Sequence, residues 1–418
     1  MRILFVVPYP PSRIRVRSYE FLVQLQKHHD VTVVTQCVSE QEHADVEGLR
    51  KRGYEVVEVN ESKRKAALRS GLALLSSLPL QAAYARSWRF TQEVQRLWEE
   101  GVFDVVHVEH LRGIASMKPL ARMYPLVWDA VDCISLLSKH TMSAGPSFSV
   151  RAIARLECNR TRRYEACILE ALQYVVVTSD RDRQAMIGLR RMHKQNMISS
   201  DDELGAGITV LPNGVDLDYF HPMHEPRRRL NLVFSGKMSY HANIATALYL
   251  HQHIMPLIWE HRPEATLTIV GSKPPKIIQN LARDRRIEVT GYVEDIRTYV
   301  GRAEVMLSPM VYSVGIQNKV LEAMALGTPV AVTTQVAEAL NARPGQDLLV
   351  AESAQEFAAA TLRLLDDADF CATLSRNGRC YVEQAHDWEV VAERLVMIYR
   401  RAIAAHTGKI LVAEEMHS

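Results

Sequence analysis

The chain has 418 residues, of which 47% are hydrophobic and 23% charged, and this balance excludes disordered and fibrous classes of protein. Its length exceeds what one hydrophobic core serves, so we expect two domains. The net charge is only +2. Residues 1–229 nevertheless carry +5, from 32 Lys and Arg against 27 Asp and Glu, whereas residues 230–418 carry −3, from 18 against 21. The basic first half fits a phosphate-bearing partner or an anionic membrane surface.

The six cysteines form no C-x-x-C pair and have no metal-ligand spacing, which predicts reduced thiols in a cytoplasmic protein. A strand-like run begins at Arg2, and this leaves no room for a signal peptide. No run of about 18 apolar residues occurs that would span a bilayer. We therefore expect a cytoplasmic protein without a transmembrane segment.

Short β-branched apolar runs alternate with longer helical patterns along the chain. In the first half these runs are 3–7, 31–35, 56–59, 105–107, 126–128, 175–178 and 208–211. In the second half they are 230–234, 265–270, 287–290, 305–307, 329–332 and 348–350. Continuously apolar strands separated by helices predict parallel sheets that are buried on both faces. Each set is sufficient for one doubly wound sheet.

A break between the two sets falls at residues 213–230, where prolines and a glycine cluster before three arginines. We therefore predict an α/β protein of two Rossmann-like domains. The N-terminal domain is expected at residues 1–225 and the second at 226–385. Residues 386–418 are expected to form a final helix followed by a frayed tail from about Ala404. The ligand site of such a pair is the cleft between the carboxyl ends of the sheets.

Residues 66–83 are rich in Leu and Ala and follow the basic run 63–65. A basic amphipathic stretch of this kind can lie in a membrane interface. The same composition also fits a helix that packs on the first sheet. Both interpretations remain open from the sequence.

The most informative segment is residues 314–330, which predicts a glycine loop, a short helix and a buried strand in that order. Gly315 lets the backbone approach a ligand closely, and Asn318 is placed to cap the helix N-terminus. Lys319 adds a positive charge there. Glu322 falls on the first turn, where its carboxylate can accept hydrogen bonds from two ribose hydroxyl groups. An anion and a ribose one helical turn apart are the two ends of a nucleoside diphosphate. An ordinary loop–helix–strand connection is the alternative interpretation.

Several motifs, spread over nearly the whole chain, resemble the GT-B glycosyltransferases of family 4 (group 1). They are Val7–Ser12, Phe103–His107, Val210–Asp216, Phe234–Lys237, Gly291–Asp295 and Gly315–Val330. The blocks Leu211–Asp216 and Gly315–Gly327 are the specific ones. The form of the last block, together with Tyr9-Pro10-Pro11, is closest to sugar transferases of bacterial exopolysaccharide clusters.

The resemblance implies the GT-B fold, two Rossmann-like domains facing a central cleft, with a nucleotide-sugar donor held by the second domain. It also implies a last helix that crosses back to the N-terminal domain, and a hexosyl transfer that retains the anomeric configuration without a metal or other cofactor. The donor-binding residues expected from it are Lys237, Val293, Gly315, Ile316, Gln317, Asn318, Lys319 and Glu322.

The chain departs from the family pattern at several positions. Val314 stands where a second glutamate usually touches the donor sugar, so backbone N–H groups of residues 315–317 are expected to take its place. Lys237 occupies the position of the usual arginine, and Asn243 that of the usual lysine. We therefore expect Lys319 to supply the missing charge. The double glycine of the first loop is replaced by residues 12–15.

Glycosyl transfer builds negative charge on the bridging oxygen of the leaving diphosphate, so fixed cations and N–H dipoles there are the main catalytic resource. Lys237 and Lys319 fit that role. The acceptor hydroxyl also needs a base or an orienting group. Asp132 is the first candidate and His110 the second, in a region where the family often has a histidine and this chain has Asp129 and Asp132.

The remaining candidates follow the same strand ends of the first domain. His107 is expected to pack at its strand end, and Glu109 and Asp129 are further carboxylates there. Arg13, Arg15 and the nearby Arg17 are expected to bind the donor diphosphate or an acceptor lipid phosphate, with plain surface charge as the alternative.

The predicted partners are a nucleotide sugar and a glycan or polyprenyl-diphosphate-linked acceptor, with peripheral contact to the anionic inner face of the cytoplasmic membrane and without nucleic acid. A catalytically impaired nucleotide-sugar-binding protein that serves as an assembly partner is the main alternative. A sugar-nucleotide epimerase needs paired carboxylates and is disfavoured. A nicotinamide enzyme needs a G-x-G-x-x-G turn after a strand, and the first strand is followed by none.

Overall fold

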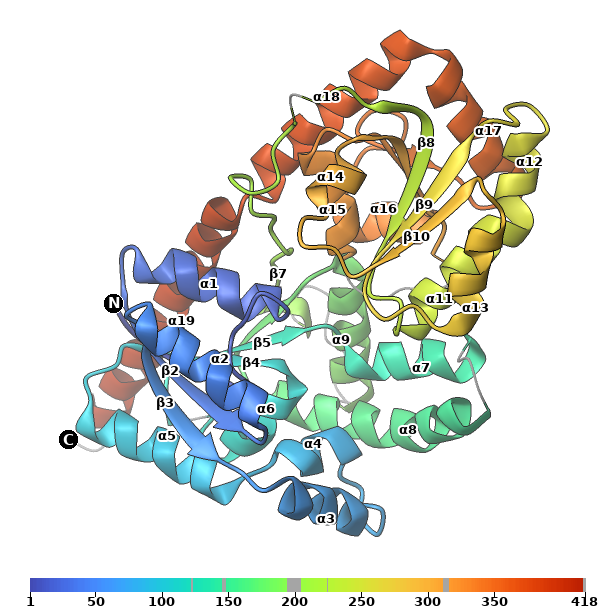
Figure 1. The fold of residues 1–418 in the computed structure, drawn as a ribbon. Helices are drawn as coiled ribbons and strands as arrows, with labels where there is room; N and C mark the ends of the chain where they lie inside the picture. Colours follow the sequence, from blue (N-terminus) through green and yellow to red (C-terminus); the bar gives the residue numbers. More distant parts are fainter. Residues whose placement is uncertain (122, 145–147, 194–203, 224, 311–315, 416–418) are drawn as a thin grey trace. The chain divides into compact units, whose positions relative to one another are not determined.

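The computed structural model describes residues 1–415 except 122, 145–147, 194–203, 224 and 311–315, and Figure 1 shows the fold. The chain divides into two compact units. The first comprises Met1–Leu211 with Val391–Ser418, and the second comprises Pro212–Val390. Each unit is described separately below.

The first unit is built on a seven-stranded parallel sheet in the order β3-β2-β1-β4-β5-β6-β7. Its strands are β1 (Arg2–Val7), β2 (Asp30–Cys37), β3 (Glu55–Asn60), β4 (Val105–Glu109), β5 (Leu126–Val131), β6 (Tyr174–Val177) and β7 (Ile208–Val210). Five consecutive residues of β1 and all five of β4 are buried, because helices cover both faces of a parallel sheet. Phe5 of β1 is in register with His107 of β4.

Helices separate the consecutive strands of the first unit, with α3, α4 and α5 between β3 and β4 and with α7 and α8 between β5 and β6 (Figure 1). They are α1 (Val16–Gln26), α2 (Glu40–Lys51), α3 (Lys63–Ala73), α4 (Leu80–Ala85), α5 (Trp88–Glu100), α6 (His110–Met117), α7 (Ile134–Ala144), α8 (Phe148–Ala171) and α9 (Asp180–His193), with a 3-10 turn at Lys118–Leu120. Ser39 and Ser87 begin α2 and α5 with side-chain caps, the residue type that satisfies free N–H groups at a helix start.

The second unit carries a six-stranded parallel sheet in the order β10-β9-β8-β11-β12-β13. Its strands are β8 (Arg228–Ser235), β9 (Thr266–Val270), β10 (Ile287–Gly291), β11 (Ala303–Ser308), β12 (Val330–Val332) and β13 (Leu349–Val350). Val305 of β11 is in register with Leu232 of β8. Both residues are fully buried and belong to the hydrophobic core of this unit.

The helices of the second unit are α11 (His241–Tyr249), α12 (Met255–Trp259), α13 (Lys276–Gln279), α14 (Arg297–Val300), α15 (Asn318–Ala325), α16 (Thr334–Leu340), α17 (Ala354–Asp366) and α18 (Ala368–Ala385). A π-helical turn, Leu250–Ile254, joins α11 to α12, and a 3-10 turn occupies Asn280–Arg283. Ser353 and Glu356 form a reciprocal capping box at the start of α17, which satisfies N–H groups that the helix itself cannot pair.

The predicted fold class is confirmed, because each apolar run named from the sequence is a strand of one of two parallel sheets. In both sheets the chain moves outward from a central strand in one direction and later returns to add strands on the other side. Right-handed crossovers in opposite directions place helices on both faces, which makes each sheet doubly wound.

The division between the units differs from the predicted boundary at residue 225, since the second unit already begins at Pro212. The physical reason is the packing of residues 212–220. Val215 is buried in the core of the second unit, and its N–H donates to the carbonyl of His386 at 2.7 Å. Leu217 and Phe220 pack against the same core.

The last helix, α19 (Trp388–Glu415), begins in the second unit and continues in the first. It contributes Tyr399, which is fully buried, to the first unit. Helical backbone extends past Ala404 to Glu415. None of the helices in the described ranges combines the length and apolarity that a bilayer span requires.

Candidate functional site

The switch point of the second sheet lies between β8 and β11, the neighbouring strands from which the chain departs in opposite directions. Ligands of open α/β sheets bind at this point, outside the carboxyl ends of the strands. Helix α11 follows β8, and helix α15 follows β11 after the segment that includes 311–315. Free N–H groups at two helix starts therefore lie at the strand ends where an anion would bind.

Backbone atoms come very close together where β8 and β9 end. Gly236 and Gly271 both have φ of 152°, a backbone conformation that favours glycine. A Cβ atom added at Gly271 would lie 1.8 Å from the carbonyl oxygen of Gly236. A Cβ atom added at Gly236 would lie 2.7 Å from the Asn243 amide nitrogen and 3.1 Å from Lys319 Nζ. Gly236 thus leaves the space in which the Asn243 and Lys319 side chains meet, and Gly271 allows the two backbones to approach each other closely.

Lys319 is held in place by residues of β8 and α11. Its Nζ donates to Asn243 Oδ1 at 2.6 Å and lies 4.6 Å from the centroid of the Phe234 ring. The other end of the Asn243 amide donates to the carbonyl of Lys237 at 3.0 Å. Asn243, which replaces the usual lysine of the family, therefore accepts a hydrogen bond from a lysine on another helix. This contact places the Lys319 ammonium beside Asn243, although the two residues come from different helices.

Glu322 lies one turn along α15 from Lys319, and both side chains are half-buried. Burial lowers the pKa of Lys319 to about 8, against the opposing effect of Glu322. Burial raises the pKa of Glu322 to about 7, against the opposing effect of Lys319. Within the described residues no hydrogen-bond donor faces the Glu322 carboxylate. The site therefore holds two desolvated groups whose charged forms a polar ligand would stabilise.

Two details of the predicted helix start are wrong. The N-cap of α15 is Gln317 and has no side-chain cap, and Asn318 is the first helical residue. Glu322 consequently lies in the second turn and not the first. The side chain of Asn318 has another partner, since its Oδ1 accepts from Asn213 Nδ2 at 3.0 Å. The carbonyl of Asn213 in turn interacts with His386 Nδ1 at 2.7 Å. The Leu211–Asp216 block thus braces the start of α15, a contact that the sequence did not reveal.

The other predicted donor residues are placed less tightly. Lys237 is exposed, and its ammonium has no partner within the described part of the chain. Ile316 is buried, and Gln317 is half-buried. Val293 is half-buried in the loop after β10, two strands away from β8. Gly315, like Val314, lies outside the described residues.

The switch point of the first sheet lies between β1 and β4. Here the predicted loop arginines have internal partners. Arg17 is buried and pairs with Asp129 through two hydrogen bonds of 2.7 and 3.2 Å. Arg15 is half-buried, pairs with Glu42 at 3.0 Å and lies 4.1 Å from the centroid of the Tyr9 ring. Arg13 is exposed and, as far as the described residues go, has no ionic partner.

Two residues at neighbouring strand ends of this sheet have left-handed backbone. His110 follows β4 with φ of 64°, and Val131 ends β5 with φ of 67°. The pairing of β5 with β6 shifts register at the same place, between Asp129 and Val131. A β-branched residue rarely adopts this conformation, and such strain concentrates at functional sites.

The two predicted acceptor-side groups lie at these strand ends. His110 Nδ1 accepts from the N–H of Arg112 at 3.3 Å, and burial and Arg112 lower the pKa of the ring to about 4. The imidazole is therefore neutral, with its proton on Nε2, and can orient a hydroxyl as a donor. Asp132 accepts from Thr178 Oγ1 at 3.2 Å, and burial and Asp182 raise its pKa to about 7. A carboxylate with a pKa close to neutral is suited to general-base catalysis.

Two neighbouring groups are enclosed. His107 is fully buried, stacks on Phe5 and lies with Nδ1 2.8 Å from the Tyr399 hydroxyl, so it packs at the strand end as predicted. Burial and Asp129 raise the pKa of Glu109 to about 8. One carboxyl oxygen of Glu109 is buried without a hydrogen-bond partner among the described groups.

Comparisons with known proteins agree with this architecture. Residues 229–367 match the family model described as glycosyl transferases group 1. HepE from Anabaena, solved with UDP and glucose, superposes with a TM-score of 0.64 at 14% identity and covers 95% of this chain and 98% of that one. Two doubly wound parallel sheets, together with the structural similarity to solved proteins such as HepE, define the GT-B class of fold.

Two curated proteins are similar in sequence. One is the MMP alpha-(1->4)-mannosyltransferase of Mycolicibacterium hassiacum, 33% identical over 211 residues, or 47% of this chain and 49% of that protein. The other is a GDP-mannose-dependent monoacylated alpha-(1-6)-phosphatidylinositol monomannoside mannosyltransferase of Corynebacterium glutamicum, 30% identical over 158 residues, or 34% of this chain and 41% of that protein. Each match covers less than half of the relative. Residues 229–367, about a third of the chain, are thus similar to the group 1 glycosyl transferases.

Proposed function

We propose that this protein is a retaining glycosyltransferase that moves a sugar from a nucleotide-sugar donor to a glycan or lipid-linked acceptor, in the synthesis of exopolysaccharide or other cell-envelope glycans. The observation that carries the proposal is the group of Lys319, Asn243 and Glu322 at the switch point of the second sheet. A diphosphate would lie against Lys319, Lys237 and the helix starts, and Glu322 would accept hydrogen bonds from the ribose.

The chemistry needs no metal in this arrangement. Negative charge grows on the leaving diphosphate as the glycosidic bond breaks, and the Lys319 ammonium and backbone N–H groups stabilise it. On the acceptor side, Asp132 would accept the proton of the attacking hydroxyl, and His110 would orient that hydroxyl. Retention of the anomeric configuration is expected from the family resemblance, and NMR of the product tests it directly.

A thermal-shift screen against UDP-, GDP- and ADP-sugars tests donor binding. We expect the sugars of one nucleotide to raise the melting temperature well above the value measured with the other two. The absence of a shift with all three would contradict the proposal. Donor hydrolysis then separates an enzyme from the alternative, a nucleotide-sugar-binding assembly partner favoured by the neutral Asn243. A transferase is expected to hydrolyse its donor slowly without acceptor, in EDTA as well as without it, and a pure binding protein is not.

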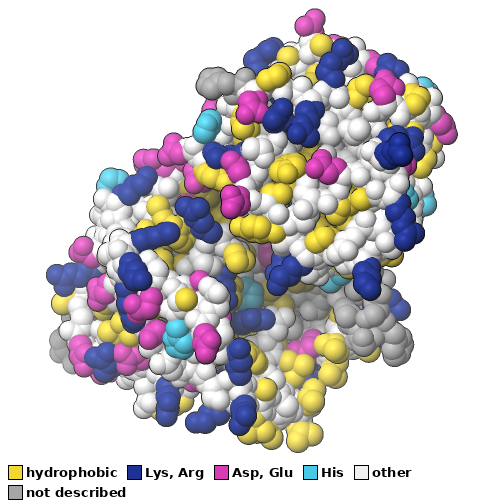
Figure 2. Space-filling view, viewed as in Figure 1, with side chains coloured by type: hydrophobic (Ala, Val, Ile, Leu, Met, Phe, Trp, Pro, Cys, Tyr) yellow, Lys and Arg dark blue, Asp and Glu magenta, His cyan; other side chains and the backbone are white. Residues whose placement is uncertain are grey.

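A lipid-linked acceptor is supported by the surface of the first unit. Lys63, Arg64 and Lys65 are exposed at the start of α3, and Leu72 and Leu75 are 60% and 91% exposed close by. Figure 2 shows hydrophobic side chains gathered on the lower part of the molecule, where α3 lies in Figure 1. The relative from C. glutamicum acts, by its name, on a phosphatidylinositol mannoside. A basic surface beside exposed leucines fits the headgroup region of an anionic membrane.

Vesicle sedimentation tests this part of the proposal. We expect salt-sensitive binding to anionic vesicles and little binding to neutral ones, because each surface Lys or Arg contributes about 1 kcal/mol. Changing Lys63, Arg64 and Lys65 to Gln should release the protein. The matched control changes Lys273, Lys276 and Arg283, which are exposed in the second unit. If the protein ignores anionic vesicles at low salt, a soluble acceptor replaces the lipid-linked one.

A further inference from the structure

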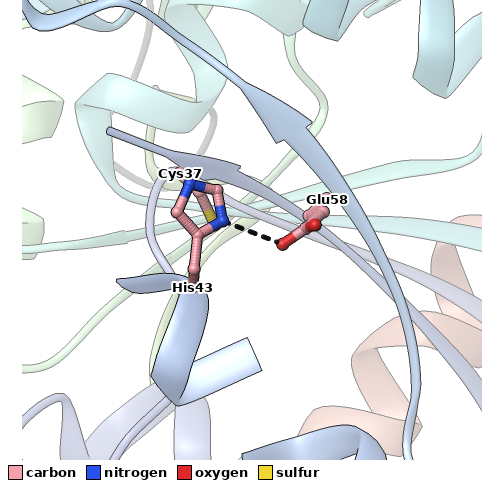
Figure 3. A group of neighbouring side chains, drawn as sticks. All are labelled: Cys37, His43 and Glu58. Atoms are coloured by element: carbon pink, nitrogen blue, oxygen red, sulfur yellow. Dashed lines mark hydrogen bonds and ion pairs between the residues drawn. The ribbon is translucent and has the colours of Figure 1, made fainter. Parts of the chain in front are cut away.

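A second cluster of reactive side chains lies in the first unit, away from its switch point. Cys37 ends β2, His43 lies on α2 and Glu58 lies on β3, at the edge of the sheet opposite to β7. One ligand atom from each residue lies within 4.8 Å of the others. Figure 3 shows the three side chains converging from two neighbouring strands and the helix between them. Glycosyl transfer as proposed above uses none of the three.

The chemistry of the set matches one kind of ion. A thiolate, an imidazole and a carboxylate are the three ligand types of zinc, with bonds of about 2.0–2.3 Å that place neighbouring ligand atoms about 3.3–3.7 Å apart in a tetrahedron. His43 Nδ1 already lies 3.3 Å from Glu58 Oε2. Cys37 is 1% exposed and fixed in the strand, whereas the His43 side chain is 41% exposed and can move to close the geometry. Oxygen-preferring ions such as Mg²⁺ do not select a thiolate.

The surroundings orient these ligands. The Nη1 atom of Arg50 lies 3.7 Å from Glu58 Oε1, and the other carboxylate oxygen, Oε2, is left to contact His43. Arg50 is itself anchored to the carbonyl of Val56 at 2.9 Å. Contacts that fix a ligating side chain from behind are a regular part of metal sites.

The connection between β2 and α2 holds the other two ligands in register. Ser39 caps α2 by accepting from the N–H of Glu42, and Glu42 accepts from the N–H of Val38 at 2.8 Å. The carbonyl of Cys37 accepts from the N–H of Glu61 at 2.9 Å, which ties the end of β2 to the segment after β3. The three ligands therefore come from a framework with little freedom.

The cluster also opens to solvent on one side. Cys37, His43 and Glu58 line a cavity of about 830 Å³ together with Ser39, Glu61 and Trp88. We propose that Cys37, His43 and Glu58 bind one Zn²⁺ ion through three protein ligands, with a fourth position that faces this cavity and takes water. On coordination the Cys37 thiol releases its proton to solvent, and the thiolate, the imidazole and the carboxylate neutralise the ion. The ion joins β2, α2 and β3 at the sheet edge and leaves the donor site unaffected.

Metal titration of the full-length, metal-free protein tests the site. With Zn²⁺ in competition against a chromogenic chelator, we expect one equivalent to bind and the melting temperature to rise. Co²⁺ as the probe should give the near-ultraviolet charge-transfer band that only a thiolate ligand produces. Cys37→Ser should abolish that band and weaken Zn²⁺ binding by about 100-fold or more, since changes to residues that merely orient a ligand already cost about 10–100-fold.

Controls and further variants keep the test decisive. Cys380→Ser and His253→Gln remove an exposed thiol and an exposed imidazole elsewhere, and both should bind Zn²⁺ like the parent. If Cys37→Ser does not fold, the surface-accessible His43→Gln and the isosteric Glu58→Gln carry the same comparison. The proposal is overturned if the parent binds no Zn²⁺, if binding survives all three substitutions, or if the Co²⁺ complex lacks the thiolate band.

Discussion

The switch points of the two sheets carry ionisable side chains in different arrangements. In the second unit, Lys319 is hydrogen-bonded to a neutral amide, and Glu322 has no donor facing it among the described residues. In the first unit, the buried Arg17 is paired with Asp129 through two hydrogen bonds. The first arrangement leaves charge available for a ligand, whereas the second satisfies it internally.

The backbone at the strand ends also differs between the two sheets. The second sheet avoids steric conflict by placing glycines at 236 and 271, where strands end close together. The first sheet keeps His110 and Val131 in the left-handed region, at the strand ends that carry Asp132. The difference teaches that one topology can prepare a site by unpaired charge or by strained backbone. The proposed function assigns the donor to the former and the acceptor to the latter, and the following experiments separate the two roles.

The largest expected effect is on the acceptor side. Asp132→Asn should lower kcat by about 10²–10⁴-fold, because general-base catalysis is lost, while the amide oxygen can still accept from Thr178. Donor affinity should stay unchanged, since this group acts only on the acceptor. Asp180→Asn, an exposed carboxylate on α9, is the matched control for steady-state kinetics. Nearly full activity in Asp132→Asn would exclude Asp132 as the base and make His110 the next candidate.

On the donor side, Lys319→Ala should lower kcat by about 10²–10³-fold and weaken donor binding much less. The reason is that charge on the leaving phosphate grows in the transition state. Lys276→Ala removes an exposed lysine of the same unit and should have no effect. Kinetics combined with calorimetry measure both quantities. An equal loss of affinity for nucleoside and for nucleoside diphosphate would instead assign Lys319 a structural role.

Glu322→Ala should weaken nucleotide-sugar binding by about 2–3 kcal/mol, or roughly 30–150-fold, the size expected for lost charged hydrogen bonds. The melting temperature should hardly change, because the carboxylate is desolvated without a described donor to compensate it. Isothermal calorimetry beside the control Glu338→Ala, an exposed carboxylate on α16, checks this. Parent-like affinity in Glu322→Ala would rule out the ribose assignment.

The smallest effect is the pH dependence of donor affinity. Lys319 is charged below its pKa of about 8, and a bound diphosphate raises that pKa, so binding should weaken as pH rises through 8. Glu322 is ionised above its pKa of about 7, so binding should also weaken as pH falls below 7. On each side of this pH profile the change in donor affinity approaches tenfold per pH unit. Asn243→Asp places a carboxylate beside Nζ and should move only the upper limb to higher pH. A flat profile from pH 6 to 9 would contradict this assignment.

The sequence predicted the strands well because their signal is local. Runs such as Ile3–Val7 are apolar throughout, and burial on both faces of a parallel sheet requires this of each residue in the run. The predicted neighbourhood of Lys319 and Glu322 has the same origin, since both lie on one short helix. The exact helix start was predicted one residue late, because Gln317 provides no side-chain cap and so leaves no sequence signature.

Contacts between distant segments could not be predicted. The bond from Lys319 to Asn243 joins residues 76 apart in the chain, and the Arg17–Asp129 pair joins residues 112 apart. The sequence showed Asn243 at a position where the family resemblance expects lysine but gave no sign of its partner. The left-handed Val131 was equally hidden, because valine predicts an ordinary strand and only the register shift beside β6 creates the strain.

Helix α19 has a consequence for the order in which the protein is made. The first unit contains Tyr399, Leu395 and Ala402 as buried residues, and the Tyr399 hydroxyl meets His107 deep in the sheet. A chain emerging from the ribosome exposes the strands of this unit early, yet its last helix arrives only after the whole second unit has been synthesised. At about 5–20 residues per second, the interval between Leu211 and Ala402 is about 10–40 s. The first unit therefore completes its fold last, and part of its apolar surface stays uncovered while the second unit is translated.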